Sequence, residues 1–302
     1  MTTIAVRLQA VRSRIEAAAA SAGRPAGEIR LIAVSKTFPA AAIEEARAAG
    51  QFAFGESYLQ EAVSKIAVSG PEVDGQTAHG QSDGGQSEGG LRSSAGVASP
   101  QARPLLLPLE WQVADGQQVH ERREGGLRSS AGVASPQAGP LLLPLEWHYI
   151  GPIQSNKTRQ IAELFHWVHG VDRLKIAERL ASSRPAGLPP LEICIQVNVS
   201  GEVSKGGVPP EEAFTLAQAI QRLSGVRLRG LMAIPEPTPN TGLQRARFRH
   251  VRELKDEIVR RGIALDTLSM GMSDDLEAAI AEGATLVRVG RAIFGERPRN
   301  AD

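Results

Sequence analysis

The chain alternates short apolar runs with amphipathic segments over most of its length. Nearly uninterrupted apolar runs predict strands at 31–35, 52–56, 147–151, 167–171, 192–199, 228–234, 267–272 and 285–294. Apolar residues at helical spacing predict helices over 2–22, 40–50, 57–67, 154–164, 173–182, 210–224, 240–262 and 274–282. Apolar strands that alternate with amphipathic helices are typical of a parallel sheet covered by helices.

The succession of strand–helix units favours an α/β fold, a single (β/α)8 TIM barrel in one domain over residues 1–302. A doubly wound sheet is the alternative, but no GxGxxG sequence follows the first strand. In the barrel, the helix over 2–22 precedes the first strand and packs outside. Functional side chains are expected at the carboxyl ends of the strands.

A segment of different composition, residues 69–143, separates the second strand from the third. It is rich in Gly, Ser, Gln and Pro, and a tandem duplication within it makes 88–111 and 124–147 identical except at Arg103 and Gly139. Such a composition cannot bury enough apolar surface to offset its ordering entropy, which predicts a flexible insertion. A phosphate-loop interpretation of GGLRSSAG is weaker, because the GK[ST] ending of a P-loop is missing.

Charge and composition argue against several classes of partner. The formal net charge is +1 and aromatic residues make up 4%, so neither nucleic acid nor a membrane surface is an expected partner. One cysteine, Cys194, excludes an intrachain disulfide and fits a reducing compartment. The arginines within 2–22 favour a mature helix over a signal peptide, and no apolar run is long enough to span a membrane. We expect a cytoplasmic protein.

The histidines of the predicted strands do not suggest a metal site. His166 and His169 are three positions apart, so a strand directs them to opposite faces. His148 lies within the third strand and is expected to pack inside the barrel. The sequence therefore predicts no metal ligands.

Lys36 follows the first apolar run, and two roles are open to a lysine at this position. A lysine at a strand end is usually an ordinary solvent-reaching residue, but a partly desolvated amine is also a nucleophile. Barrel closure would place Lys36 beside the eighth strand, near an inward-pointing Arg288. Gly271 and Gly290 permit a close backbone approach there, and Ser273 suits either a helix cap or a phosphate contact. Together these residues suggest a phosphorylated aldehyde held as a Schiff base, for which pyridoxal phosphate (PLP) is the prime candidate.

Seven sequence blocks make a family resemblance specific. In order along the chain they read AVSKTFP, FGESYLQEA, WHYIGPIQSNKTR, QVNVSGEVSKGG, GLMAIP, LSMGMSDDLEAAI and LVRVGRAIFG. They resemble the pyridoxal phosphate homeostasis protein family, which has an alanine-racemase-like barrel (PLP fold type III). The resemblance covers almost the whole chain outside 69–143.

The resemblance implies a set of cofactor-binding residues. Lys36 would form a covalent aldimine with PLP, Ser273 and Gly290 would hold the phosphate, and Arg288 would face the pyridine nitrogen. Asn198, Met232 and Ser269 would surround the cofactor.

Three positions depart from the family pattern. Ser57 replaces an asparagine that is common in the family, and Pro152 stands where many members have histidine. Arg291 stands where some members have threonine, although a guanidinium can bind the same anion.

The resemblance favours a binding protein that acts in intracellular PLP (vitamin B6) and amino-acid homeostasis. A cation opposite the pyridine nitrogen disfavours its protonation and weakens carbanion chemistry. Related racemases use a tyrosine base from a further C-terminal domain. We expect that the chain, which ends at Asp302, leaves no room for that domain and that Tyr149 is a core residue. No robust catalytic activity is expected; a weak amino-acid racemase or another Schiff-base enzyme is the alternative. We expect a monomer, with PLP-dependent apoenzymes as acceptors. An interaction module built on the insertion is a third, less supported class.

Overall fold

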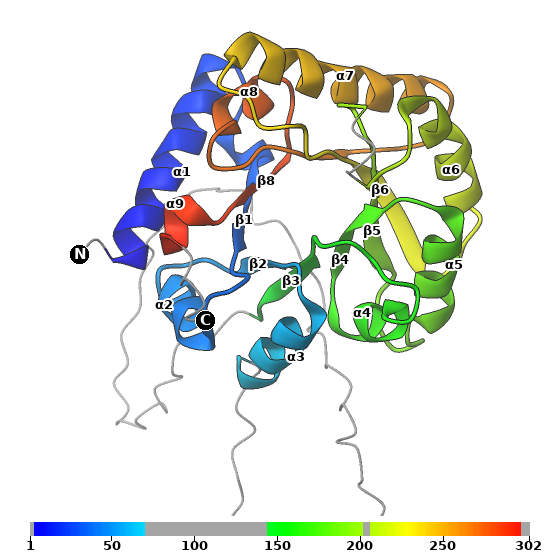
Figure 1. The fold of residues 1–302 in the computed structure, drawn as a ribbon, viewed down its shortest axis with the longest axis horizontal. Helices are drawn as coiled ribbons and strands as arrows, with labels where there is room; N and C mark the ends of the chain where they lie inside the picture. Colours follow the sequence, from blue (N-terminus) through cyan, green and yellow to red (C-terminus); the bar gives the residue numbers. More distant parts are fainter. Residues whose placement is uncertain (1–2, 70–143, 202–205, 297–302) are drawn as a thin grey trace, which may run out of the picture. The chain divides into compact units, whose positions relative to one another are not determined.

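Eight parallel strands form a closed barrel in the order β1 to β8, as predicted (Figure 1). The structure is a computed structural model that describes residues 3–69, 144–201 and 206–296. The strands are β1 (Arg30–Val34), β2 (Ala53–Glu56), β3 (Glu146–Tyr149), β4 (Trp167–Val171), β5 (Leu191–Gln196), β6 (Val226–Met232), β7 (Thr267–Ser269) and β8 (Leu286–Val289).

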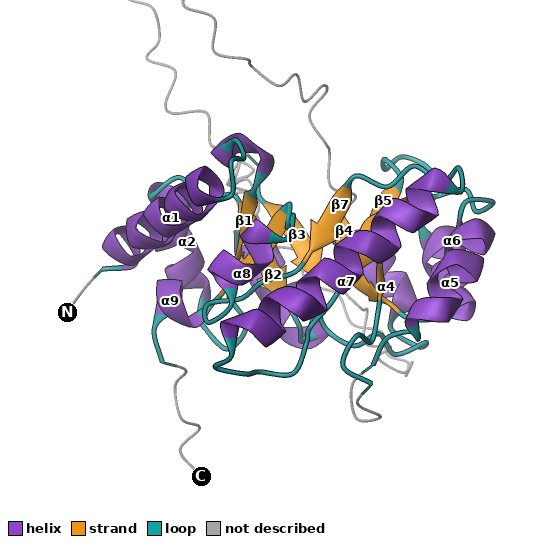
Figure 2. Cartoon of the chain, turned by 90° about the horizontal axis from the view of Figure 1, so that it is seen from above, coloured by secondary structure: helices purple, strands orange, loops and turns teal. Residues whose placement is uncertain are grey.

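Helices surround the barrel, and Figure 2 shows them outside the strands. They are α1 (Ile4–Ser21), α2 (Ala40–Ala48), α3 (Leu59–Val68), α4 (Thr158–Leu164), α5 (Leu174–Ser183), α6 (Ala213–Ile220), α7 (Thr241–Arg260), α8 (Leu276–Ala281) and α9 (Arg291–Phe294), with 3-10 turns η1 (Ala26–Glu28) and η2 (Pro210–Glu212). The first helix, α1, contacts α2, α8 and α9, so it packs outside the barrel as expected.

The predicted eighth strand is too long. We expected a strand over 285–294, but β8 ends at Val289 and the short helix α9 follows. A strand would direct the neighbouring Ile293 and Phe294 to opposite faces, whereas the helical turn buries both. Phe294 packs on Phe38 with ring centroids 5.1 Å apart. An apolar run alone does not distinguish these two conformations.

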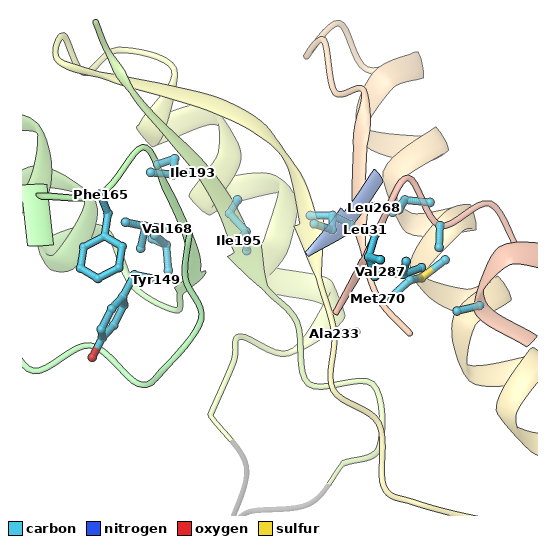
Figure 3. Close-up of a cluster of buried hydrophobic side chains, with 14 of the residues drawn as sticks. Leu31, Tyr149, Phe165, Val168, Ile193, Ile195, Ala233, Leu268, Met270 and Val287 are labelled. Atoms are coloured by element: carbon cyan, nitrogen blue, oxygen red, sulfur yellow. The ribbon is translucent and has the colours of Figure 1, made fainter. Parts of the chain in front are cut away.

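Strand alternation divides the core into two layers. Outward-facing side chains pack against the helices, as Figure 3 shows for Leu31, Val168, Ile195 and Val287 among others. Inward-facing apolar side chains form a smaller cluster in the barrel interior: Ile32, Trp167, Cys194, Met232 and Leu286. Each large apolar side chain buried in this way contributes about 1.5–3 kcal/mol, so the outer layer supplies most of the hydrophobic stabilisation.

The pairing of β1 with β8 closes the barrel. In this parallel register Ile32 lies opposite Arg288, and Ala33 lies opposite Val289. The chain that leaves β1 therefore emerges beside the chain that leaves β8, although more than 250 residues separate them in sequence. This closure places Lys36 near Arg288 and Gly290.

The predicted insertion falls between β2 and β3, because β2 ends at Glu56 and β3 begins at Glu146. Residues 70–143 lie outside the described residues, and so do the first duplicated copy and most of the second. The flexibility of this segment and the extent of the barrel domain stay predictions.

Candidate functional site

A cavity of about 490 Å³ opens at the carboxyl ends of the strands. Its volume falls in the range of small-molecule and cofactor sites. Five predicted site residues line it, namely Lys36, Ser273, Arg288, Gly290 and Arg291. The other lining residues are Val34, Ser57, Ile150, Ile234, Met272, Asp274 and Glu296.

Lys36 lies just beyond the end of β1 and is half-buried. Its Nζ is 3.4 Å from the Oγ of Ser57 on the loop after β2. Ser57, one of the departures from the family pattern, is thus in contact with the lysine. The next residue, Thr37, has φ of +71°, a left-handed conformation that is unusual for a non-glycine residue. The surrounding contacts must hold this turn in place.

A buried ion pair holds the turn that carries Lys36. Lys65 on α3 donates from Nζ to Glu56 Oε1 at 2.7 Å and to the Ser35 carbonyl oxygen at 2.7 Å. Ser35 also donates from its hydroxyl to Glu56 Oε1 at 2.6 Å. Glu61 links Lys65 to the other side of the turn, because its Oε1 also accepts from the Thr37 backbone N–H. Both neighbours of Lys36 are therefore fixed to one polar cluster.

Burial raises the pKa of the Glu56 carboxyl, and hydrogen bonds from Lys65 and Ser35 oppose that effect. Glu56 is fully buried and Lys65 is 4% exposed. A charge removed from water to this extent is tolerated only when its partner stays in place.

Two glycines shape the opposite wall of the cavity. Gly271, after β7, has φ of +94°, and a Cβ there would lie 2.6 Å from the Cβ of Ala279. A Cβ on Gly290 would lie 3.2 Å from the Val34 carbonyl oxygen, so glycine lets the β1 and β8 ends approach closely without a tight contact. The short helix α9 follows directly, and its Ile293 and Phe294 N–H groups both donate to the Gly290 carbonyl oxygen at 2.9 Å.

Ser273 does not cap the following helix. The helix α8 begins at Leu276, with Asp275 at the N-cap position. The carboxylate of Asp275 accepts a hydrogen bond from the Met272 N–H at 2.6 Å, which stabilises this turn. The Ser273 side chain lines the cavity instead, on the same wall as Arg291, which pairs with Asp274.

Arg288 is the buried cation of the site. It is 4% exposed, and its guanidinium donates to Ser269 Oγ at 2.5 Å and to the Ala233 carbonyl oxygen at 3.0 Å. Burial lowers its pKa to about 10, which still leaves it charged at neutral pH. No ion pair among the described residues includes Arg288. Its charge therefore faces the cavity without a carboxylate in contact.

Three further predicted residues do not line the cavity. Ser269 is fully buried and does not contact the cavity directly. It accepts a hydrogen bond from Arg288, which does line the cavity. Met232 is buried in the interior cluster. Asn198 lies after β5 and donates its backbone N–H to the Val208 carbonyl oxygen at 2.9 Å. The direct contacts of all eight residues with a cofactor stay predictions.

Sequence reasoning missed the polar cluster under Lys36. Glu61 and Lys65 lie four positions apart on one helix, directly after a strand that ends in a glutamate, and this spacing was the available signal. It also missed the partners of the histidines. His148 Nδ1 and His169 Nε2 lie 3.0 Å apart inside the barrel, as Glu146 approaches His148 from the other side.

His166 and His169, which the sequence expects on opposite faces of a strand, contact different groups. His166 accepts from the Trp147 N–H, while His169 contacts Ser269, so the two histidines serve different partners. Within the described ranges, no cluster of three or more His, Cys, Asp or Glu side chains is arranged to hold a metal ion. In those same ranges, no helix is long and apolar enough to cross a membrane.

Comparison with known proteins identifies the family. The model of the family described as alanine racemase, N-terminal domain, matches residues 6–298. The pyridoxal phosphate homeostasis protein of Pseudomonas aeruginosa is 47% identical over 301 residues, which cover 100% of this chain and 99% of that protein. The chain belongs to the pyridoxal phosphate homeostasis protein family. The proteins of the same name from Vibrio cholerae and Escherichia coli are 40% and 41% identical, over 100% and 98% of this chain and of those proteins.

Solved structures agree with this family and with the barrel. PipY of Synechococcus elongatus with PLP bound is 30% identical, with a TM-score of 0.65, and the match covers 97% of this chain and 100% of that chain. The alanine racemase of Corynebacterium glutamicum shares the fold at 13% identity and a TM-score of 0.54, over 98% of this chain and 63% of that chain. The alanine-racemase-like barrel predicted from the sequence is confirmed.

The first prediction concerns the buried ion pair. Lys65→Met keeps the side-chain volume but leaves Glu56 buried without its cation, which should lower the free energy of unfolding by about 3–5 kcal/mol. Urea denaturation measures this change. The matched control is Lys175→Met on the exposed surface of α5, which should change stability by less than about 0.5 kcal/mol. Equal effects of the two substitutions would contradict the role assigned to Lys65.

The second prediction concerns pH. Burial lowers the pKa of His166 to about 4 and also lowers the pKa values of His148 and His169. Below a pH of about 6.5 the unfolded chain therefore binds protons that the folded chain excludes, and stability should fall as pH falls. His166→Gln should reduce this slope by up to roughly 1.4 kcal/mol per pH unit. Urea titrations from pH 7.5 to 5 test it, and a slope in His166→Gln equal to that of the wild type would contradict the prediction.

Proposed function

We propose that this chain binds PLP as a Schiff base on Lys36 and acts in intracellular PLP (vitamin B6) and amino-acid homeostasis. The observation that carries the proposal is that Lys36 and Arg288, far apart in sequence, line one cavity with Gly290 and Ser273. An amine, an anion-binding wall and a buried cation are the groups that an aldehyde, a phosphate and a pyridine ring require.

Relatives support the choice of cofactor. PipY, 30% identical, has been solved both without PLP and with PLP bound. The curated relatives are named pyridoxal phosphate homeostasis proteins.

The phosphate would lie against the wall formed after β7 and β8. Ser273 can donate a hydroxyl hydrogen bond, and Gly290, which has no side chain, permits a close approach of an anion to the backbone. Arg291 adds a guanidinium in place of the hydroxyl of some family members, although Asp274 partly neutralises it. Lys36 stands on the other wall, so the cofactor would extend between the two.

Arg288 would keep the pyridine nitrogen unprotonated, because a second positive charge beside a buried guanidinium is unfavourable. PLP supplies an electron sink for carbanion chemistry, and an unprotonated ring makes that sink weaker. This electrostatic arrangement favours holding the cofactor over turning substrates over.

The tyrosines of the described chain are not placed as a second base. Tyr149 is 4% exposed, packs on Phe165, and donates its hydroxyl to the Pro152 carbonyl oxygen at 3.1 Å. It is a core residue, as the sequence predicted, and burial raises the pKa of its hydroxyl. Tyr58 is exposed, and neither tyrosine lines the cavity. Racemisation needs bases on both faces of the bound substrate, so we infer that any such activity is weak.

The proposal extends to partners and location. We infer that the protein is a cytoplasmic monomer that exchanges PLP with PLP-dependent apoenzymes. The balanced charge and low aromatic content of the chain support a small-molecule ligand over nucleic acid or a membrane.

The third prediction tests the cofactor. Purified protein incubated with PLP should show a visible absorbance band that borohydride fixes covalently, with the added mass on the peptide that contains Lys36. Lys36→Ala should lose both the band and the adduct, because the amine is missing. Lys175→Ala should keep both. A wild-type protein that shows neither the band after removal of free PLP nor an adduct after borohydride treatment would rule the proposal out.

The fourth prediction separates a carrier from an enzyme. The PLP-loaded protein should racemise alanine, and other amino acids in a panel, at rates no more than a few times that of free PLP. Chiral chromatography of each reaction measures this. Turnover at ordinary enzyme rates, about 1–1,000 per second, would establish the racemase alternative.

A further inference from the structure

A line of polar side chains crosses the apolar interior of the barrel. His148 on β3, His169 on β4 and Ser269 on β7 are all fully buried, and they connect Glu146 at the start of β3 with Arg288 on β8. In the ring of strands β4 stands opposite β8, so the line spans the barrel. Unsatisfied polar groups at this depth would be costly, which makes their pairing informative.

The contacts along this line are continuous. Arg30 Nη2 lies 2.7 Å from Glu146 Oε2, and Glu146 Oε1 lies 2.8 Å from His148 Nε2. That last contact is a close approach without hydrogen-bond geometry, and among the described residues neither atom has a hydrogen-bond partner. His148 Nδ1 is 3.0 Å from His169 Nε2, and His169 Nδ1 is 2.7 Å from Ser269 Oγ. Ser269 Oγ in turn is 2.5 Å from Arg288 Nη1.

The two ends of the line favour one direction for its hydrogen bonds. The ion pair with Arg30 keeps the Glu146 carboxylate ionised and able only to accept, which favours a proton on Nε2 of His148. Neutral His148 then accepts at Nδ1 from His169 Nε2–H. Neutral His169 accepts at Nδ1 from the Ser269 hydroxyl. The Ser269 hydroxyl has a single hydrogen, which it donates to His169. Its oxygen therefore accepts the hydrogen bond from Arg288.

This direction matters for the buried cation. Every hydrogen-bond dipole along this line of polar side chains points its negative end toward Arg288. Hydrogen bonds aligned in one direction strengthen one another. The Arg288 guanidinium is therefore stabilised although no carboxylate contacts it. A carboxylate in contact would neutralise its positive charge. The interior holds two imidazoles that add no charge of their own.

We propose that His169, supported by His148, is a positioning residue that orients Arg288 through Ser269. With His169 in place, the Ser269 hydroxyl hydrogen is committed away from Arg288, and the guanidinium has a fixed acceptor behind it. Without His169 the hydroxyl can rotate its hydrogen toward the guanidinium and repel it. This inference rests on the proposed function, because it assigns Arg288 to the ring nitrogen of the cofactor.

The first arm of the test uses the unliganded wild-type protein. Nitrogen-15 spectra of the labelled histidine rings should show His148 and His169 neutral, with the proton on Nε2 of each, at pH 7 and still at pH 5.5. Assignment uses the single variants His148→Gln and His169→Gln. A proton on Nδ1 of either ring, or a charged ring, would break the chain and overturn the proposal.

The second arm uses the cofactor. His169→Phe removes both ring nitrogens, and His169→Gln retains one donor and one acceptor. His169→Phe should still form the visible band, but with a PLP dissociation constant raised about tenfold, as expected for a weakened hydrogen bond to a charged group. The pH at which the band titrates should move by about one unit, and His169→Gln should restore part of both changes.

The control for this arm is Leu286→Ala, which leaves a cavity in the same interior cluster and keeps every residue of the hydrogen-bonded line. It should lower stability without moving the titration of the band. If His169→Phe behaves like Leu286→Ala, the role of His169 is only structural and the proposal fails. A wild-type protein without a band would count against the proposed function, while the ring spectra would still decide the hydrogen-bond chain.

Discussion

The pairing of β1 with β8 is the constraint on which the site depends. Only a closed ring brings the first and last strands into register, and this register sets Ile32 opposite Arg288. The amine of Lys36 and the anion-binding wall after Gly290 then face one cavity. An open sheet with the same strands would leave these groups at separate edges. The site therefore forms only when the barrel closes.

Buried charged groups lie next to that site in two places. Below Lys36, the pair of Lys65 and Glu56 ties the strained turn at Thr37 to α3 and β2. Behind the cavity, Arg288 is buried with neutral hydrogen-bond acceptors instead of a carboxylate. The first arrangement neutralises its charges and gives rigidity, whereas the second preserves a positive charge for a ligand. Both are costly to bury, and both act on groups that line the cavity.

Several elements were predictable because their signals are local. Alternating apolar strands and amphipathic helices predicted the barrel, and the seven blocks predicted the family. Lys36 and Arg288 were predictable as neighbours because barrel closure is a general rule. The end of β8 was not, because an apolar run is compatible with both a strand and a helix, and burial of Ile293 with Phe294 decided between them. Whether Ser273 caps a helix likewise depended on where α8 begins, and the N-cap position belongs to Asp275.

By itself, the sequence determined the order of the strands and helices, the family and the residue types available at each strand end. Those features follow from periodicity and from short motifs, which need no knowledge of distant contacts. Only the tertiary structure decided which buried polar groups meet, because the partners of Lys65, His148 and His169 lie on other elements. Their pairing depends on side-chain direction and depth inside a closed barrel, and no linear spacing encodes either.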